Sequence, residues 1–334
     1  MAIIVIAEAG VNHNGDIALA KQLVEVAAKS GANFVKFQTF RADRLATKSA
    51  PKAAYQLKKS VNSESQYEML KELELSESMH RELIHECRHL GIGFLSTAFD
   101  IESADMLLEL GQEIFKVPSG EISNLPYLRH LGSFGKQVFL STGNSTMDEI
   151  EKAVDILEAS GTKKSQITVL HCTSAYPAPI EDVNLLAMKS IKDRIGVKVG
   201  YSDHTLGVEI AIAAAALGAS VIEKHFTINR NLPGPDHKCS LEPEELELMI
   251  CQIRNIELAL GDGVKRPRKS EIVNRDKVRK SVVAKISIRK GEKFSVDNVT
   301  TKRPGNGISP MEWDRLIGKA AHRDFMIDEF IDEA

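Results

Sequence analysis

The sequence predicts a (β/α)8 barrel followed by a small β-rich domain. Eight short apolar runs, each typical of a buried strand, alternate with amphipathic helical segments over about 260 residues. No glycine-rich dinucleotide turn follows the first run, which argues against an open doubly wound sheet. Most runs end in polar side chains, and the carboxyl ends of the strands form the active-site face of such a barrel. The pattern therefore predicts an enzyme.

The first two strands flank a helix. Ile3–Ala9 is β-branched and continuous, as in a strand covered on both faces, and a flexible polar loop follows it. Asp16 is the expected N-cap of a helix with apolar residues at helical spacing. Phe34–Phe37 begins the second strand. The polar insertion from Arg41 to Ser65 is too long for an ordinary connection, so we expect it to be functional.

The alternation continues through six further strands. They are predicted at Gly93–Leu95, Ile114–Val117, Val138–Leu140, Ile167–Leu170 and at segments beginning with Val199 and Val221. Helices such as Met147–Leu157 and Glu242–Leu260 lie between or after them. Polar residues at the strand ends are Glu8, Lys36, Gln38, Thr97, Lys116, Ser119, Glu121, Ser141, Tyr176, Ser202, His204, Glu223 and His225.

Two successive strands end in histidine, at His204 and His225. Neutral imidazoles are good ligands for divalent metals, so the pair predicts a metal site. A pair of hydrogen-bonded core histidines explains this pattern alone equally well. Lys36 and Lys116, with several hydroxyls and small glycine loops, indicate an anionic ligand such as a phosphate. Because no nucleotide-binding signature is present, that phosphate is expected on a small substrate.

The composition of the chain changes after residue 263. Residues 1–263 are predicted to form the barrel, 264–280 an exposed charged linker, and 281–334 a compact β-rich domain that needs a docking surface. The net charge of −3 and the 43% apolar content give no reason to expect nucleic acid or a membrane surface. The beginning of the chain is interpreted as a strand and not a signal peptide, and the four cysteines show no zinc or disulfide spacing. Cytoplasm is the expected location.

The combination of motifs closely resembles the sialic acid synthase family, also called nonulosonate synthases. The matching runs, in family order, are A-E-A-G-V-N-H-N-G, K-F-Q-T-F, F-K-V-P-S-G-E, L-S-T-G, L-H-C-T with Y-P, G-Y-S-D-H-T, E-K-H-F-T, P-G-P-D-H and K-R-P-G-N-G. They cover nearly the whole chain, including a C-terminal piece similar to the family's antifreeze-like (SAF) domain. The resemblance implies condensation of phosphoenolpyruvate with an N-acetylmannosamine-type sugar and water, giving a sialic acid and phosphate. It also implies a divalent ion, manganese first with magnesium or cobalt as alternatives, and a domain-swapped homodimer.

The resemblance assigns roles to individual residues. His204 and His225 match metal ligands and catalytic positions, and Glu121 matches the acid–base carboxylate. Positions that match phosphoenolpyruvate contacts are Lys36, Lys116, Ser119, Ser141, Ser174 and Ser202. Positions that match sugar contacts are Glu8, Gln38, Tyr176, Asp236 and Arg303. The family implies that Arg303 acts in trans, on the barrel of the other subunit. An ion pair with Lys116 is the structural alternative for Glu121.

The sequence departs from the family at Ser174, where some members carry Asn or Glu, at Ala98, where Pro is common, and at Asn144, where Met is common. The nature of the sugar stays open. N-acetylneuraminate synthesis is the first expectation, and N,N'-diacetyllegionaminate synthesis from 2,4-diacetamido-2,4,6-trideoxymannose is the alternative. Loops such as Ala53–Asn62 are expected to distinguish the two sugars. A metal-dependent aldolase or lyase, or a binding protein built on the C-terminal domain, are more distant alternatives.

Overall fold

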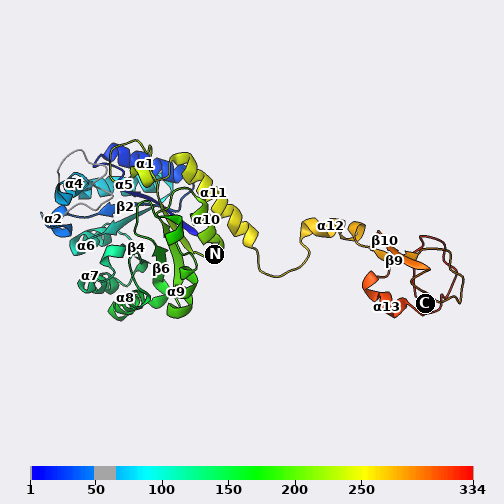
Figure 1. The fold of residues 1–334 in the computed structure, drawn as a ribbon. Coiled ribbons are helices and arrows are strands. Elements are labelled where there is room, and N and C mark those ends of the chain that lie inside the picture. Colours follow the sequence, from blue (N-terminus) through cyan, green and yellow to red (C-terminus); the bar gives the residue numbers. More distant parts are fainter. Residues whose placement is uncertain (1, 49–64, 334) are drawn as a thin grey trace. The chain divides into compact units, whose positions relative to one another are not determined.

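The computed structural model describes residues 2–48 and 65–333, which divide into two compact units (Figure 1). The first unit ends at Gly261 and the second begins at Asp262. No helix in these two described ranges is long and apolar enough to span a membrane.

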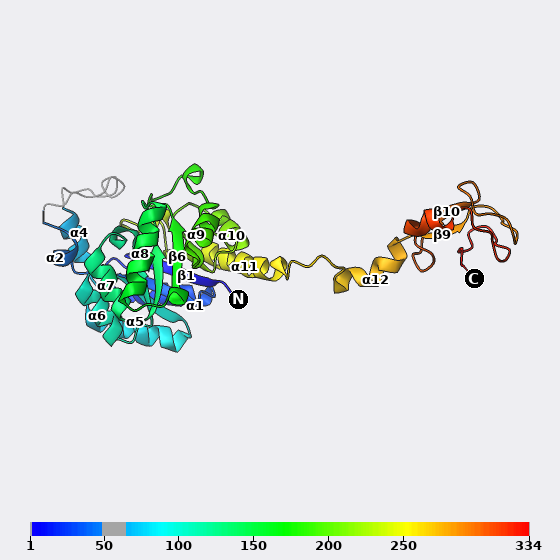
Figure 2. The same cartoon turned by 90° about the horizontal axis from the view of Figure 1, so that it is seen from below.

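The first unit is a closed parallel barrel of eight strands, as the sequence predicts. The strands follow one another in chain order, and β1 pairs with β8 to close the ring. They are β1 (Ile4–Gly10), β2 (Phe34–Thr39), β3 (Gly93–Ala98), β4 (Ile114–Val117), β5 (Gln137–Ser141), β6 (Ile167–Cys172), β7 (Lys198–Asp203) and β8 (Val221–His225). The helices lie outside the strands, as Figure 2 shows for α7, α8 and α9 around β6.

The helices of this unit are α1 (Ile17–Lys29), α2 (Ala42–Leu45), α4 (Gln66–Glu72), α5 (Glu77–Leu90), α6 (Ile101–Glu109), α7 (Leu125–Ser133), α8 (Met147–Ser160), α9 (Ala187–Ile195), α10 (Glu209–Ala216) and α11 (Pro243–Leu260). Most of them bury apolar side chains against the strands, whereas α4 has no fully buried residue and packs against α2. The predicted N-cap of α1 is confirmed, because the Asp16 carboxylate accepts a hydrogen bond from the Ala18 amide at 2.7 Å.

The inside of the barrel has an apolar layer beneath a polar one. A separate cluster of buried side chains forms the apolar layer: Ile6, Leu95, Phe139, Leu170 and Val221. Strand side chains alternate between the two faces, so residues two positions further along point the same way. Glu8, Thr97 and Ser141 follow members of the apolar layer by that interval. Polar groups from distant parts of the sequence therefore lie together above a layer of buried apolar side chains.

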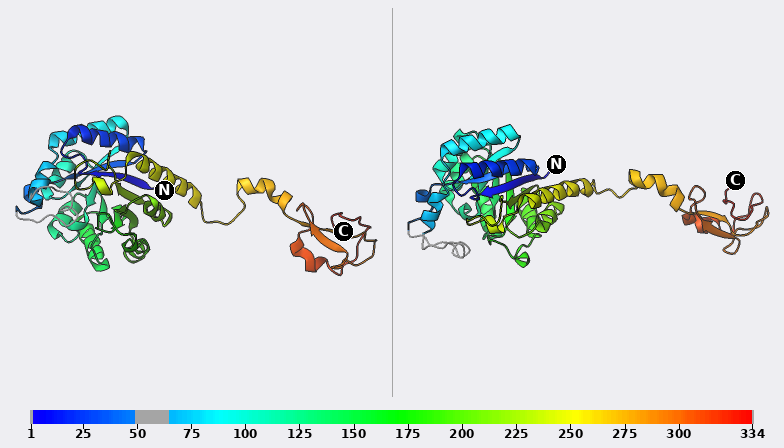
Figure 3. Two further views of the ribbon diagram at one scale, coloured as in Figure 1. Left: turned by 45° about the horizontal axis from the view of Figure 1, so that its top comes forward. Right: turned by 90° about the horizontal axis from the view of Figure 1, so that it is seen from above.

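The second unit has its own small core and is β-rich, as predicted. β9 (Ser281–Ala284) pairs antiparallel with β10 (Val299–Lys302), and α13 (Trp313–Leu316) packs with them through Leu316 (Figure 3). The stretch predicted as a linker contains the helix α12 (Lys269–Val278), and all of its residues are exposed. The sequence predicts that exposure but not the helix, which lacks an apolar face.

Candidate active site

A cavity of about 320 Å³ opens at the carboxyl ends of the barrel strands. It brings together eleven of the fourteen residues to which the resemblance assigns roles: Glu8, Lys36, Gln38, Lys116, Ser119, Ser141, Ser174, Tyr176, Ser202, His204 and His225. They come from seven strands or the loops that follow them. The cavity is therefore the candidate active site.

Two lysines and two glutamates form a buried ion cluster in the cavity. Lys36 Nζ lies 2.8 Å from Glu8 Oε2 and 3.7 Å from Glu223 Oε2, while Lys116 Nζ donates to Glu223 Oε1 at 3.0 Å. The Ser202 hydroxyl donates to the same Glu223 oxygen at 3.0 Å. The sequence indicates Glu223 as a strand-end residue but gives it no site role. Its spacing of two from His225 on one strand is the signal that could have found it.

Burial and ion pairing set the protonation of this cluster. Burial disfavours charge on Glu223, yet Lys116 and Lys36 outweigh it and hold the pKa of Glu223 well below its usual range. Burial likewise opposes the charge on Lys36, but Glu223 and Glu8 raise the Lys36 pKa. Burial raises the pKa of Glu8 from 4.5 to about 7, although Lys36 opposes the shift. Of the two carboxyls, Glu8 is therefore the one that takes up a proton more readily.

Several buried polar atoms in the cavity have no hydrogen-bond partner among the described residues. They include Ser141 Oγ, Glu223 Oε2 and His225 Nδ1. Such atoms are rare in folded proteins and indicate a place for a ligand. Small residues also pack closely in the lining of this cavity, since a β-carbon on Gly143 would lie 1.9 Å from Ser174 Oγ. The Gly143 amide donates to Ser119 Oγ at 2.9 Å, which fixes that hydroxyl in the cavity lining.

The two predicted histidines face each other with ring centroids 5.7 Å apart. His204 Nδ1 bonds to the Thr173 carbonyl at 2.7 Å, so Nδ1 carries the proton and Nε2 keeps its lone pair. Burial lowers the pKa of His204 to about 3 and also lowers that of His225, so both are neutral at pH 7. The absence of a side chain at Gly10 leaves room for the His225 ring, because a β-carbon there would lie 3.2 Å from His225 Cε1.

These residues fit a loosely held divalent ion. Two neutral imidazoles with available lone pairs could supply two ligands. Within the described parts of the chain, no group of three or more His, Cys, Asp or Glu side chains is arranged to hold a metal. The remaining ligands would therefore come from substrate and water, as in catalytic sites with open positions.

An ion pair on the outer face of the barrel fixes the two strands that carry the histidines. Lys224 Nζ lies 2.6 Å from Asp203 Oδ2 and also donates to the Thr205 carbonyl at 2.6 Å. Both charged side chains are at most 1% exposed. Because strand residues alternate, Asp203 and Lys224 point outward where their neighbours His204 and His225 point into the cavity. The pair thus holds β7 and β8 in register next to the histidines.

Three residues singled out from the sequence do not line this cavity. Glu121 is half-buried on the turn after β4, and its carboxylate accepts a hydrogen bond from Asn124 at 2.5 Å. The ion pair expected as the alternative role of Glu121 does not form, because Lys116 bonds to Glu223. Asp236 lines an adjoining cavity, together with Gln38, Tyr176 and His225. Arg303 is exposed on the second unit, next to the end of β10.

The three departures from the family pattern have different surroundings. Ser174 lines the cavity and packs on Gly143. Ala98 is buried, and its carbonyl accepts a hydrogen bond from the Tyr127 hydroxyl at 2.5 Å. Asn144 has a φ of 59°, a left-handed conformation that asparagine adopts more readily than methionine. Only Ser174 among the three lines the cavity.

The comparison with protein families agrees with this geometry. The model of the NeuB family matches residues 23–265, which include most of the barrel. The chain belongs to the NeuB family. The SAF domain model matches residues 279–334, so this member of the family carries a C-terminal SAF domain, as the motifs predict.

Named relatives of this family member extend over nearly its whole length. It is 55% identical to the N,N'-diacetyllegionaminic acid synthase of Campylobacter jejuni, over 99% of both chains. The protein of the same name from Legionella pneumophila is 46% identical, over 95% of this chain and 90% of that one. The N-acetylneuraminic acid synthetase structure from Leptospira borgpetersenii is 34% identical, with a TM-score of 0.72 over 82% and 90% of the chains. The relatives thus favour the alternative over the first expectation, N-acetylneuraminate synthesis.

Proposed function

We propose that this protein condenses phosphoenolpyruvate with 2,4-diacetamido-2,4,6-trideoxymannose and water, giving N,N'-diacetyllegionaminate and phosphate. The observation that carries the reaction class is a cavity in which two buried lysines lie beside two neutral histidines. The choice of sugar rests on the 55% identity to a relative of that name.

Phosphoenolpyruvate occupies the lysine side of the cavity in this proposal. Lys36 and Lys116 offer charge-assisted bonds to its phosphate and carboxylate, and hydroxyls from nearby loops complete the contacts. The hydroxyls are those of Ser119, Ser141, Ser174 and Ser202. Ser141 Oγ lacks a partner among the described residues and is available to an incoming anion. On the sugar side, Glu8, Gln38, Tyr176, Asp236 and Arg303 are the proposed contacts.

His204 and His225 would hold the divalent ion, for which manganese is our first choice and magnesium or cobalt are alternatives. A bound ion of this kind supplies Lewis-acid polarisation of the sugar's open-chain aldehyde. The protein itself keeps both imidazoles neutral and sets their tautomer and orientation. The Thr173 carbonyl does this for His204 by fixing its tautomer.

The reaction forms a carbon–carbon bond and a carbon–oxygen bond to water, and it breaks the carbon–oxygen bond to phosphate. The methylene carbon of phosphoenolpyruvate attacks the aldehyde, whose oxygen gains a proton, and water adds at the enol carbon before phosphate leaves. Glu8, with a pKa of about 7, is suited to give a proton to the aldehyde oxygen. Glu121 stays the candidate for taking the proton of the water. In that role its carboxylate would turn from Asn124 toward the cavity.

Phosphate release distinguishes this reaction from its rivals. We expect phosphate to appear only when phosphoenolpyruvate and the sugar are both present, measured continuously with a coupled phosphate assay. A metal-dependent aldolase or lyase would instead release pyruvate from the nine-carbon product without phosphate chemistry, and a binding protein would turn over neither substrate. Phosphate release from phosphoenolpyruvate without sugar, at the full rate, would contradict the proposal.

We further propose a homodimer in which Arg303 of each subunit completes the site of the other. A planar guanidinium suits an acetamido carbonyl or sugar hydroxyls, and Arg303 is exposed on its own unit. Inactive Arg303→Ala and inactive His225→Ala proteins should therefore regain activity after subunits exchange, because one site of each mixed dimer is intact. If mixed dimers form and no activity returns, Arg303 does not act in trans.

A further inference from the structure

A second cavity, of about 190 Å³, adjoins the candidate active site and has an apolar wall. The wall is formed by Val11, Met69, Leu70, Leu73 and Phe99. Four residues border both cavities: Gln38, Phe99, Tyr176 and His225. A ligand that reaches from the polar cavity past Gln38 therefore meets apolar side chains next.

The apolar wall belongs to a small hydrophobic cluster distinct from the main core. Val11, Phe40 and Leu73 are buried at its centre, and Met69, Leu70 and Phe99 pack against them half-exposed. Phe40 and Phe99 contact edge to face, with ring centroids 6.1 Å apart. Met69 and Leu70 lie on α4, a short helix whose N-terminus has a capping box between Ser65 and Glu68. The half-exposed side chains are thus the part of the cluster that a ligand can touch.

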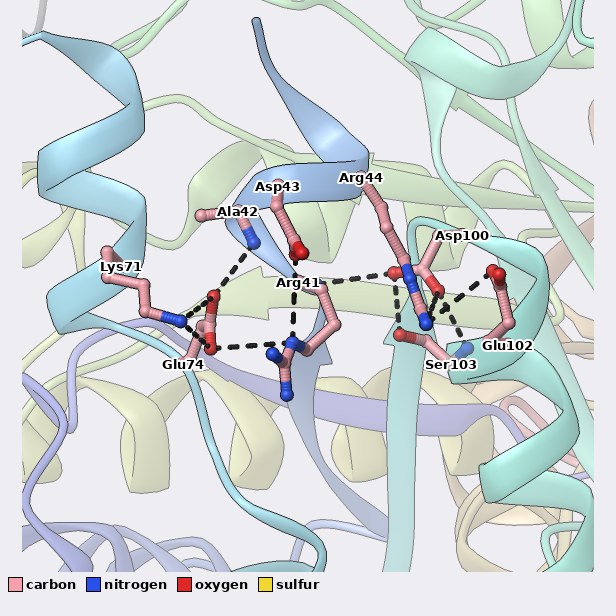
Figure 4. Close-up of polar contacts among 9 residues, drawn as sticks. All are labelled: Arg41, Ala42, Asp43, Arg44, Lys71, Glu74, Asp100, Glu102 and Ser103. Atoms are coloured by element: carbon pink, nitrogen blue, oxygen red, sulfur yellow. Dashed lines mark hydrogen bonds and ion pairs between the residues drawn. The ribbon is translucent and has the colours of Figure 1, made fainter. Parts of the chain in front are cut away.

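Polar contacts on both flanks hold α2 and the end of α4 in place (Figure 4). Glu74, just after α4, accepts a hydrogen bond from the Ala42 amide at 2.8 Å and pairs with Lys71 at 3.2 Å. On the other side, Asp100 lies 3.6 Å from the Arg44 guanidinium and accepts the Arg41 amide at 3.3 Å. These bonds tie the wall to the loop after β3, so its position is fixed relative to the barrel.

We infer that the apolar wall, chiefly through the half-exposed Met69 and Leu70, selects for a sugar with a methyl group at C6 and an acetamido methyl at C4. The inference rests on the proposed function, in which the sugar's C1 aldehyde meets phosphoenolpyruvate in the polar cavity. With C1 held there, the C4 and C6 substituents of the open chain lie at the far end, beside the wall. Gln38 at the boundary and Asp236 within the second cavity offer polar groups for the C4 amide.

A sugar with a C6 hydroxyl is disfavoured by the same wall. Its hydroxyl would leave water to face thioether and hydrocarbon groups, which offer no strong hydrogen-bond partner. An apolar pocket rejects an analogue that merely adds a hydroxyl by about a hundredfold at most. The wall therefore accounts for a preference of roughly ten- to hundredfold for the 6-deoxy sugar over N-acetylmannosamine.

The test compares two sugars with wall variants. Met69→Gln and Leu70→Gln put polar groups on the wall at half-exposed positions, so folding should be retained, and the melting temperature and the phosphoenolpyruvate KM check this. We expect kcat/KM for 2,4-diacetamido-2,4,6-trideoxymannose to fall about ten- to hundredfold, while that for N-acetylmannosamine stays or rises. Met69→Leu should keep the wild-type ratio, as should Leu258→Gln, which alters a residue 83% exposed on α11.

The outcomes separate the inference from the proposed function. The inference is supported if the ratio of kcat/KM for the 6-deoxy sugar to kcat/KM for N-acetylmannosamine falls in the Gln variants but not in Met69→Leu or Leu258→Gln. If the wild type is active on the 6-deoxy sugar, and the Gln variants lose activity equally on both sugars or lose none, the inference is overturned. The proposed function then still stands. A wild type that releases no phosphate with either sugar overturns both.

Discussion

Replacement of His204 or His225 with alanine is expected to abolish turnover and leave the barrel folded. Each change removes one of two imidazoles that face each other in the cavity. Loss of Lewis-acid polarisation removes several kcal/mol of transition-state stabilisation, on the order of a thousandfold or more in kcat. The measurements are phosphate release, the content of bound manganese per subunit, and the far-ultraviolet circular dichroism.

His89→Ala provides a matched control, because His89 is exposed on α5 and does not line the cavity. It should keep both activity and metal content. Removal of the ion with a chelator should stop the wild type, and addition of manganese should restore it. Full activity after chelation, with metal shown to be absent, would contradict the assignment of the two histidines.

Lys36→Ala and Lys116→Ala should each raise the KM for phosphoenolpyruvate far more than the KM for the sugar. A charge-assisted hydrogen bond contributes about 1.5–3 kcal/mol, which is roughly ten- to hundredfold in affinity. Each change also removes the nearest cation of a buried carboxylate, Glu8 in one case and Glu223 in the other. Breaking a buried pair costs about 3–5 kcal/mol of stability, so denaturant unfolding should be measured alongside the kinetics.

Lys189→Ala is the control for these variants. Lys189 pairs with Asp193 on the exposed side of α9, and exposed pairs contribute little to stability, about 0.2–1 kcal/mol. Its kinetics and unfolding should match the wild type. An unchanged KM for phosphoenolpyruvate in both folded lysine variants would mean that the anion binds elsewhere.

The sequence predicts the parts of the site that follow from strand periodicity. Apolar runs locate the ends of the strands, and alternation determines which side chains share a face, so Lys36, Lys116 and both histidines can be grouped from the sequence alone. The ion cluster cannot be predicted in the same way. Glu223 meets Lys116 from 107 positions away, a contact that exists only because the barrel closes.

Other differences between the expected and the observed site have local physical causes. The motif around Glu121 indicates a cavity residue, but a short turn points its carboxylate to Asn124, three positions later. Selection of the sugar is expected from Ala53–Asn62, which lies outside the described residues. The apolar wall comes from α4, from Leu73 just after it, and from residues after β1 and β3. Nothing in the spacing of Met69 and Leu70 distinguishes a ligand wall from an ordinary helix face.

The relative activity on two sugars tests the proposed function most directly. Purified protein with phosphoenolpyruvate and manganese should be given 2,4-diacetamido-2,4,6-trideoxymannose or N-acetylmannosamine, with phosphate measured by rate and product by mass. We predict a kcat/KM at least about tenfold higher for the trideoxy sugar, with one phosphate released per N,N'-diacetyllegionaminate formed. A higher kcat/KM for N-acetylmannosamine, with N-acetylneuraminate as the product, would contradict the account.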